Sequence, residues 1–201
     1  MFIKICGLRS PEIVDECVAL GVDAVGFVFA ESSVRFIEPS AVRALMHRVP
    51  ASVEGVGVFQ NAAMDAVIST LEQAGLSTAQ LHGAASAEDV AQLESRGLRV
   101  IRARSVSEYL SEPGSAGRVL IDGDEPGSGA EFAASRLDGH ELPPGWILAG
   151  GLTPQNVARR MGELGPSGVD VSSGVESSRG VKSVELIREF VGAVRAGLPT
   201  V

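Results

Sequence analysis

The sequence predicts an α/β protein whose strands close into a parallel (β/α)8 TIM barrel, and three observations indicate this fold. Short apolar runs alternate along the 201 residues with segments whose apolar residues recur at helical spacing. About eight such strand and helix units follow one another with short connections, as in a closed parallel sheet. Two turns of small residues follow the last two strands, where barrels of this class bind phosphate. The alternative is an open doubly wound sheet, which would carry a glycine-rich fingerprint at the first turn, whereas the sequence there is Cys6-Gly7-Leu8.

The expected strands are short apolar runs, several of them continuous, as expected when a parallel sheet is covered on both faces. They cover residues 2–6, 23–29, 53–59, 78–81, 98–103, 118–121, 146–149 and 169–171. The first expected helix opens at Ser10-Pro11, a cap followed by proline at the first helical position, and it ends at Gly21. The others cover residues 39–49, 62–75, 87–95, 105–110, 130–137, 153–162 and 181–196. The fifth should be reduced to a turn or two, because the chain is near the minimum length for this barrel.

Composition limits the protein to one domain over residues 1–201, since a chain of this length with 45% hydrophobic residues buries one substantial core. A net charge of −8 argues against a nucleic-acid or anionic membrane surface. The sequence has no apolar run long enough to span a bilayer and no signal-type leader, so a cytoplasmic location is expected. The two cysteines, Cys6 and Cys17, match no zinc-binding spacing.

The two turns near the C-terminal end predict a phosphate clamp. In one, an apolar strand breaks into Ser172, Ser173 and Gly174, whose small side chains let a phosphate approach the backbone N–H groups. In the other, Gly150-Gly151 permits the same close approach, and Thr153 is expected to cap the helix that begins at Pro154.

Five further residues fall at strand ends or in the loops above them, where the mouth of a barrel forms: Cys6, Arg35, His82, Asp122 and Asp170. Asp122 ends a wholly apolar strand, so its carboxyl is either a general acid with a raised pKa or a loop cap. Cys6 is either a proton acceptor or a small buried hydrophobe. Arg35 offers a guanidinium fork for a carboxylate. For His82 and Asp170 the residues alone favour structural hydrogen bonding.

These residues and their neighbours resemble the phosphoribosylanthranilate isomerase family of tryptophan biosynthesis over nearly the whole chain. The resemblance is carried, in order, by Lys4-Ile5-Cys6-Gly7-Leu8, Gly26-Phe27-Val28-Phe29, Arg35-Phe36-Ile37, Val56-Gly57-Val58-Phe59, Gln80-Leu81-His82-Gly83, Leu148-Ala149-Gly150-Gly151-Leu152-Thr153-Pro154-Gln155-Asn156-Val157 and Asp170-Val171-Ser172-Ser173-Gly174-Val175-Glu176.

The resemblance implies a (β/α)8 barrel that converts N-(5-phosphoribosyl)anthranilate into 1-(2-carboxyphenylamino)-1-deoxyribulose 5-phosphate by an Amadori rearrangement, without cofactor or metal. Cys6 matches the family's general base, Asp122 its general acid and Arg35 the arginine that faces the anthranilate carboxylate. The implied partner is a phosphorylated small molecule, and the chain is expected to be a monomer or a homodimer.

The sixth loop departs from the family pattern. Where the family usually has Gly-Gly-Thr/Ser-Gly, this chain has Pro126 followed by Gly127, Ser128 and Gly129, which are kept as candidate substrate contacts. There are two rival functions. A bifunctional relative that also handles the histidine-pathway substrate would carry aspartate at the end of the first strand, where this chain has Cys6. A barrel that only binds phosphorylated ligands would need neither Cys6 nor Asp122.

Overall fold

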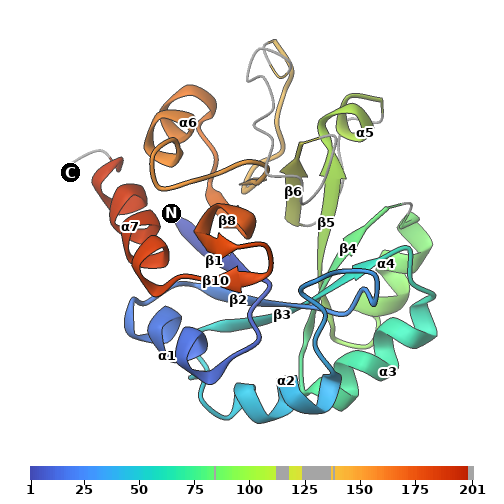
Figure 1. Ribbon diagram of the computed structural model, residues 1–201. Helices are drawn as coiled ribbons and strands as arrows, with labels where there is room; N and C mark the ends of the chain where they lie inside the picture. The colour runs from blue at the N-terminus through green and yellow to red at the C-terminus, as the bar shows by residue number, and fades with distance from the viewer. Residues whose placement is uncertain (84, 112–117, 124–136, 138, 199–201) are drawn as a thin grey trace.

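Eight parallel strands form a closed barrel in the computed structural model, in the order β1 to β8 (Figure 1). The structure describes residues 1–83, 85–111, 118–123, 137 and 139–198. The strands are β1 Phe2–Cys6, β2 Ala24–Val28, β3 Glu54–Gln60, β4 Thr78–His82, β5 Arg99–Ser105, β6 Arg118–Asp122, β7 Ile147–Leu148 and β8 Gly168–Val171. Pairing of β1 with both β2 and β8 closes the ring. The predicted barrel is confirmed.

Helices lie outside the ring of strands (Figure 1). They are α1 Pro11–Ala19, α2 Pro39–Met46, α3 Met64–Ala74, α4 Ala87–Glu94, α5 Val106–Ser111, α6 Val157–Leu164 and α7 Val184–Ala196. The fifth has six residues, so the predicted reduction is confirmed. The expected sixth helix over residues 130–137 falls almost wholly outside the described residues. In the described part of the chain, no helix has the length and apolar character needed to cross a membrane.

Two helix starts differ from the prediction. The helix expected from Thr153 begins at Val157, because the Asn156 side chain accepts the Thr153 N–H at 2.8 Å and donates to the Gly151 carbonyl at 2.9 Å. These two bonds hold the intervening residues in a turn, so the predicted Thr153 cap is wrong.

The last helix, expected from residue 181, begins at Val184, where the Ser183 hydroxyl caps it by accepting the Leu186 N–H. Residues 181 and 182 instead form strand β10 (Val181–Lys182), which pairs antiparallel with β9 (Glu176–Ser178). This hairpin follows the short 3-10 helix η2 (Ser173–Val175), and it brings Lys182 to the end of β8, where its ammonium donates to the Ser172 carbonyl.

The barrel has two apolar layers, because successive side chains on a strand point to opposite faces of the sheet. Ile3 and Ile5 belong to the layer between strands and helices, whereas Cys6 belongs to the smaller layer inside the ring. Lys4 has the same parity as Cys6 and is fully buried. The interior therefore holds a charged side chain directly below the end of β1.

Candidate active site

The carboxyl ends of the strands open onto a cavity of about 160 Å³ at one end of the barrel. Six of the residues singled out in the sequence line this cavity: Cys6, Arg35, His82, Asp122, Asp170 and Ser172. They come from strands or loops spread around the ring, and the closure of the sheet brings them together. The expected convergence of these residues at the mouth is what the structure shows.

Asp122 ends β6 with its carboxyl largely buried. The pKa of this carboxyl is raised from 3.8 to about 6, mainly by burial and also by nearby Asp170, while the Gly123 N–H, which donates to Oδ1 at 2.7 Å, and the positive charge of Lys4 oppose the change. A carboxyl with this pKa keeps part of its proton near neutral pH, so it can act as a general acid.

Cys6 lies at the end of β1, and 5% of its surface is exposed. Burial raises the pKa of its thiol above the ordinary 9.0, and the positive charge of Lys4 acts in the opposite direction. Lys4 donates a hydrogen bond to the Asp170 carboxylate at 2.9 Å from inside the barrel. Burial lowers the pKa of the Lys4 ammonium, but Asp170 and Cys6 outweigh burial and leave that pKa raised. Lys4 therefore remains a cation.

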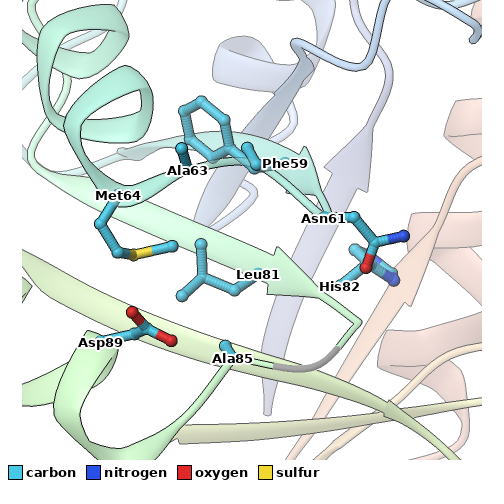
Figure 2. Close-up of a pocket in the computed structure, with 9 residues that line it drawn as sticks. Phe59, Asn61, Ala63, Met64, Leu81, His82, Ala85 and Asp89 are labelled. Atoms are coloured by element: carbon cyan, nitrogen blue, oxygen red, sulfur yellow. The ribbon is translucent and has the colours of Figure 1, made fainter.

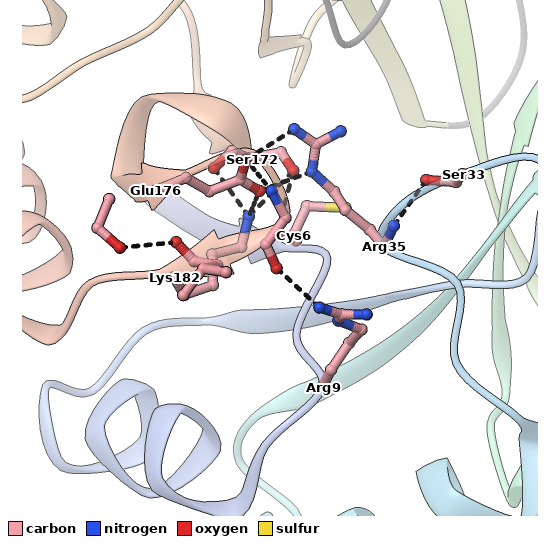
Figure 3. A network of polar contacts seen from close by, with 10 residues as sticks. Cys6, Arg9, Ser33, Arg35, Ser172, Glu176 and Lys182 are labelled. Carbon is pink, nitrogen blue, oxygen red and sulfur yellow. Dashed lines mark hydrogen bonds and ion pairs between the residues drawn. The ribbon is translucent and has the colours of Figure 1, made fainter.

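Arg35 is held by Glu176 through two parallel hydrogen bonds, from Nε at 2.7 Å and Nη2 at 2.9 Å (Figure 3). Lys182 donates to the same carboxylate at 2.7 Å and to the Ser172 carbonyl at 2.8 Å. Burial opposes ionisation of Glu176, but Arg35 and Lys182 prevail and lower its pKa to about 2. Within the described part of the chain, Arg35 Nη1 makes no hydrogen bond, so one edge of the guanidinium can take a ligand carboxylate.

The two phosphate-turn candidates pack directly against each other. A Cβ on Gly174 would lie 1.7 Å from the Leu152 carbonyl oxygen, so only glycine allows this contact. Gly150 and Gly151 adopt φ values of 84° and 63°, which favour glycine. Among the described residues, the amides of Gly150 and Gly151 have no protein acceptor. These amides can donate to an anion.

His82 lies where the mouth meets a second cavity. Burial lowers the pKa of its imidazole to about 4, so the ring is neutral near pH 7, and its Nε2 is 2.8 Å from Gln80 Nε2. The second cavity, about 460 Å³, lies between the ends of β3 and β4 and is also lined by Met64, Leu81 and Asp89 (Figure 2). It is larger than the mouth cavity, but the candidate acid and base both line the smaller one.

Three candidate contacts, Gly127, Ser128 and Gly129, lie outside the described residues. Lys4, Glu176 and Lys182 were given no role by sequence reasoning, although each touches a candidate. Lys4 carries a weak signal, since it is a charged residue inside an apolar strand run. In the described residues, no group of three His, Cys, Asp or Glu side chains is placed to hold a metal ion.

Comparisons with known proteins agree with this geometry. The family model of N-(5'phosphoribosyl)anthranilate (PRA) isomerase matches residues 3–193. A relative from Rhodospirillum rubrum, N-(5'-phosphoribosyl)anthranilate isomerase, is 40% identical over 97% of this chain and 98% of its own length. The crystal structure of TrpF from Jonesia denitrificans has a TM-score of 0.87 and 40% identity, and covers 98% of each chain.

A third similar protein was solved with a ligand. It is a phosphoribosyl anthranilate isomerase in complex with reduced 1-(o-carboxyphenylamino)-1-deoxyribulose 5-phosphate, with a TM-score of 0.86 and 30% identity, covering 98% of this chain and 99% of its own. Because the family model matches residues 3–193 and the Rhodospirillum rubrum relative is 40% identical, the chain belongs to the N-(5'-phosphoribosyl)anthranilate isomerase family.

Proposed function

We propose that this protein isomerises N-(5-phosphoribosyl)anthranilate in tryptophan biosynthesis, with Asp122 as general acid and Cys6 as general base. The observation that carries the proposal is that a carboxyl with a pKa raised to about 6 and a thiol next to a buried lysine line the same mouth cavity. Ring opening of a glycosylamine needs an acid, and the following step needs a base.

The reaction follows from these two groups. Asp122 gives its proton to the ribose ring oxygen, the C1′–O bond breaks, and a Schiff base forms between C1′ and the anthranilate nitrogen. The Cys6 thiolate then removes the proton from C2′ and leaves an enolamine. Tautomerisation adds a proton at C1′ and releases the proton of the 2′-hydroxyl, so the overall reaction neither gains nor loses hydrogen.

Substrate binding is assigned to two parts of the mouth. The turns that contain Gly150, Gly151, Ser172, Ser173 and Gly174 are proposed to hold the phosphate, and binding energy at this remote group positions the reacting carbons. The free edge of Arg35 is proposed to hold the anthranilate carboxylate. Both ends of the substrate would then be fixed while C1′ and C2′ lie between acid and base.

Turnover of freshly made phosphoribosylanthranilate, followed by loss of anthranilate fluorescence, tests the proposal. Cys6→Ser and Asp122→Asn should each lower kcat by about 10² to 10⁴-fold. Cys17→Ser is the matched control, because Cys17 is fully buried on α1, away from the mouth, and the variant should keep wild-type turnover per folded molecule. A wild type that binds the product without turnover would favour the ligand-binding barrel instead.

The pH profile adds a second test of the same pair. Asp122 must keep its proton and Cys6 must lose its own, so turnover should fall tenfold for each pH unit below about 6. Above that pH the gain in thiolate offsets the loss of protonated Asp122, which gives a plateau that ends only above the ordinary thiol pKa of 9.0. An optimum with no plateau would contradict these assignments.

We further infer a cytoplasmic location, where free Cys6 and Cys17 stay reduced. The active form is taken as one barrel domain over residues 1–201, as a monomer or a homodimer, with a phosphorylated small molecule as its substrate.

A further inference from the structure

Lys4 and Cys6 reach into the same space inside the barrel. They are two residues apart on β1, about 6.7 Å along the strand, and both point inward. Gly26 of β2 is the backbone partner of Cys6 and leaves the space between them open. A Cβ placed on Gly26 would lie 2.8 Å from Cys6 Sγ and 3.2 Å from Lys4 Cε, so the end of the lysine converges on the sulfur.

Asp170 fixes the other side of the Lys4 ammonium. The register of β1 and β8 makes Lys4 and Asp170 backbone partners, and the ammonium donates to Asp170 Oδ1 at 2.9 Å. Replacing a buried ion pair with apolar side chains is often neutral or stabilising, so this pair is weak evidence for a role in stability. Its position, with Asp170 lining the mouth beside Cys6, favours a role in the chemistry.

The charges that act on the Cys6 sulfur come from residues of several elements. Lys4 on β1 and Lys182 on β10 favour the thiolate, and Asp170 on β8 opposes it. Arg35, in the loop after β2, is also within electrostatic reach. Lys182 forms an ion pair with Glu176, and Arg35 makes two hydrogen bonds to the same carboxylate. The Lys4 ammonium, in contrast, interacts with one Asp170 oxygen and with Cys6.

We propose that Lys4 is a positioning residue for the isomerisation, whose ammonium stabilises the thiolate form of Cys6 that takes the proton from C2′. Before catalysis the thiol proton passes to solvent, Lys4 keeps its own proton, and Asp170 holds the ammonium beside the sulfur. When the thiolate takes the C2′ proton, the charge on the sulfur disappears and the Lys4–Asp170 pair remains. The inference rests on the proposed role of Cys6 as the base.

Alkylation of Cys6 measures the thiolate without depending on turnover. Wild type and Lys4→Met are treated with iodoacetamide from pH 6 to 10, and modification of each cysteine is followed by peptide mass spectrometry. Because an adjacent cation favours the thiolate, Lys4→Met should slow alkylation of Cys6 roughly tenfold or more at a given pH below 9. Cys17, fully buried behind β1, reports in the same digest whether the variant has unfolded.

A double variant keeps the test decisive if an unpaired Asp170 disrupts the fold. Lys4→Met/Asp170→Leu removes both charges and leaves none uncompensated, and its Cys6 should still react more slowly than that of wild type, since Lys4 acts on the thiol more strongly than Asp170 does. Cys6 alkylation at the wild-type rate in either variant, with Cys17 protected, would overturn the proposal.

Steady-state kinetics separate this inference from the proposed function. Lys4→Met should lower kcat roughly tenfold or more and leave KM nearly unchanged, because a residue beneath the sulfur acts through Cys6. The plateau of its pH profile should be lower than that of wild type and should extend to higher pH. A KM increase with unchanged kcat would overturn the positioning role. A wild type without turnover, but with Lys4-dependent alkylation of Cys6, would overturn the proposed function and leave the Lys4–Cys6 coupling standing.

Discussion

Replacing Asp122 with asparagine should stabilise the fold while it removes the proposed general acid. The folded protein moves the pKa of this carboxyl from 3.8 to about 6, which corresponds to about 3 kcal/mol at 1.36 kcal/mol for each pH unit. That is the cost of keeping Asp122 ionised at pH 7 in its buried position. Asparagine is neutral and similar in shape, and its side-chain oxygen can still accept the Gly123 N–H.

The sign of the pH dependence follows from the raised pKa. Below pH 3.8 the carboxyl is protonated in both the folded and the unfolded chain, so the wild type bears no cost. As the pH rises from 3.8 to about 6, the unfolded chain ionises first and the wild type loses stability relative to Asp122→Asn. Above about 6 the difference stays constant.

Urea unfolding followed by circular dichroism measures this difference. Asp122→Asn should be more stable than wild type by about 1 to 3 kcal/mol at pH 7 and by less than about 1 kcal/mol at pH 4. Asp65→Asn, at an exposed carboxylate in the first turn of α3, is the control and should gain nothing at pH 7. A less stable Asp122→Asn at pH 7, or a difference that ignores pH, would refute the argument.

Three further substitutions test other parts of the site. Glu176→Gln should raise KM about tenfold with a small change in kcat, because the Arg35 guanidinium loses its charged bidentate partner, and steady-state kinetics would contradict this if kcat alone fell. Gly174→Ala should weaken product binding roughly tenfold or more in calorimetry, because the new methyl would collide with the Leu152 carbonyl. Gly192→Ala, in α7 with open space around it, should instead raise stability by about 0.5 to 1 kcal/mol in urea unfolding and leave binding unchanged.

The barrel could be predicted because its elements carry local signals. Continuous apolar runs such as Val25–Val28 mark strands covered on both faces, and Pro11 and Pro39 mark helix starts. The start of α6 was wrong because Thr153-Pro154 carries the same local signal, while the Asn156 side chain makes a competing turn. A cap signature indicates that a helix follows but does not say how many residues of turn come first.

The contacts around the candidate base could not be predicted. Placing Cys6 and Asp122 at the mouth needs only the end of each strand, whereas pairing Lys4 with Asp170 needs the register of two strands at opposite ends of the sequence. No local pattern specifies that register. The hydrogen bonds between Arg35 and Glu176 could not be predicted either, because they depend on the short β9–β10 hairpin, which the sequence periodicity does not reveal.

The pairing of β1 with β8 also determines when the site can form during folding. Lys4 and Asp170 are separated by 166 residues, so their contact requires closure of nearly the longest loop in the barrel. Contacts of such separation tend to form late, after local strand and helix units. We therefore expect Lys4 to stay hydrated during synthesis until β8 has left the ribosome and docked beside β1. The same docking event completes the mouth above Cys6, so a partly made chain holds the sequence of the proposed catalytic centre without its chemistry.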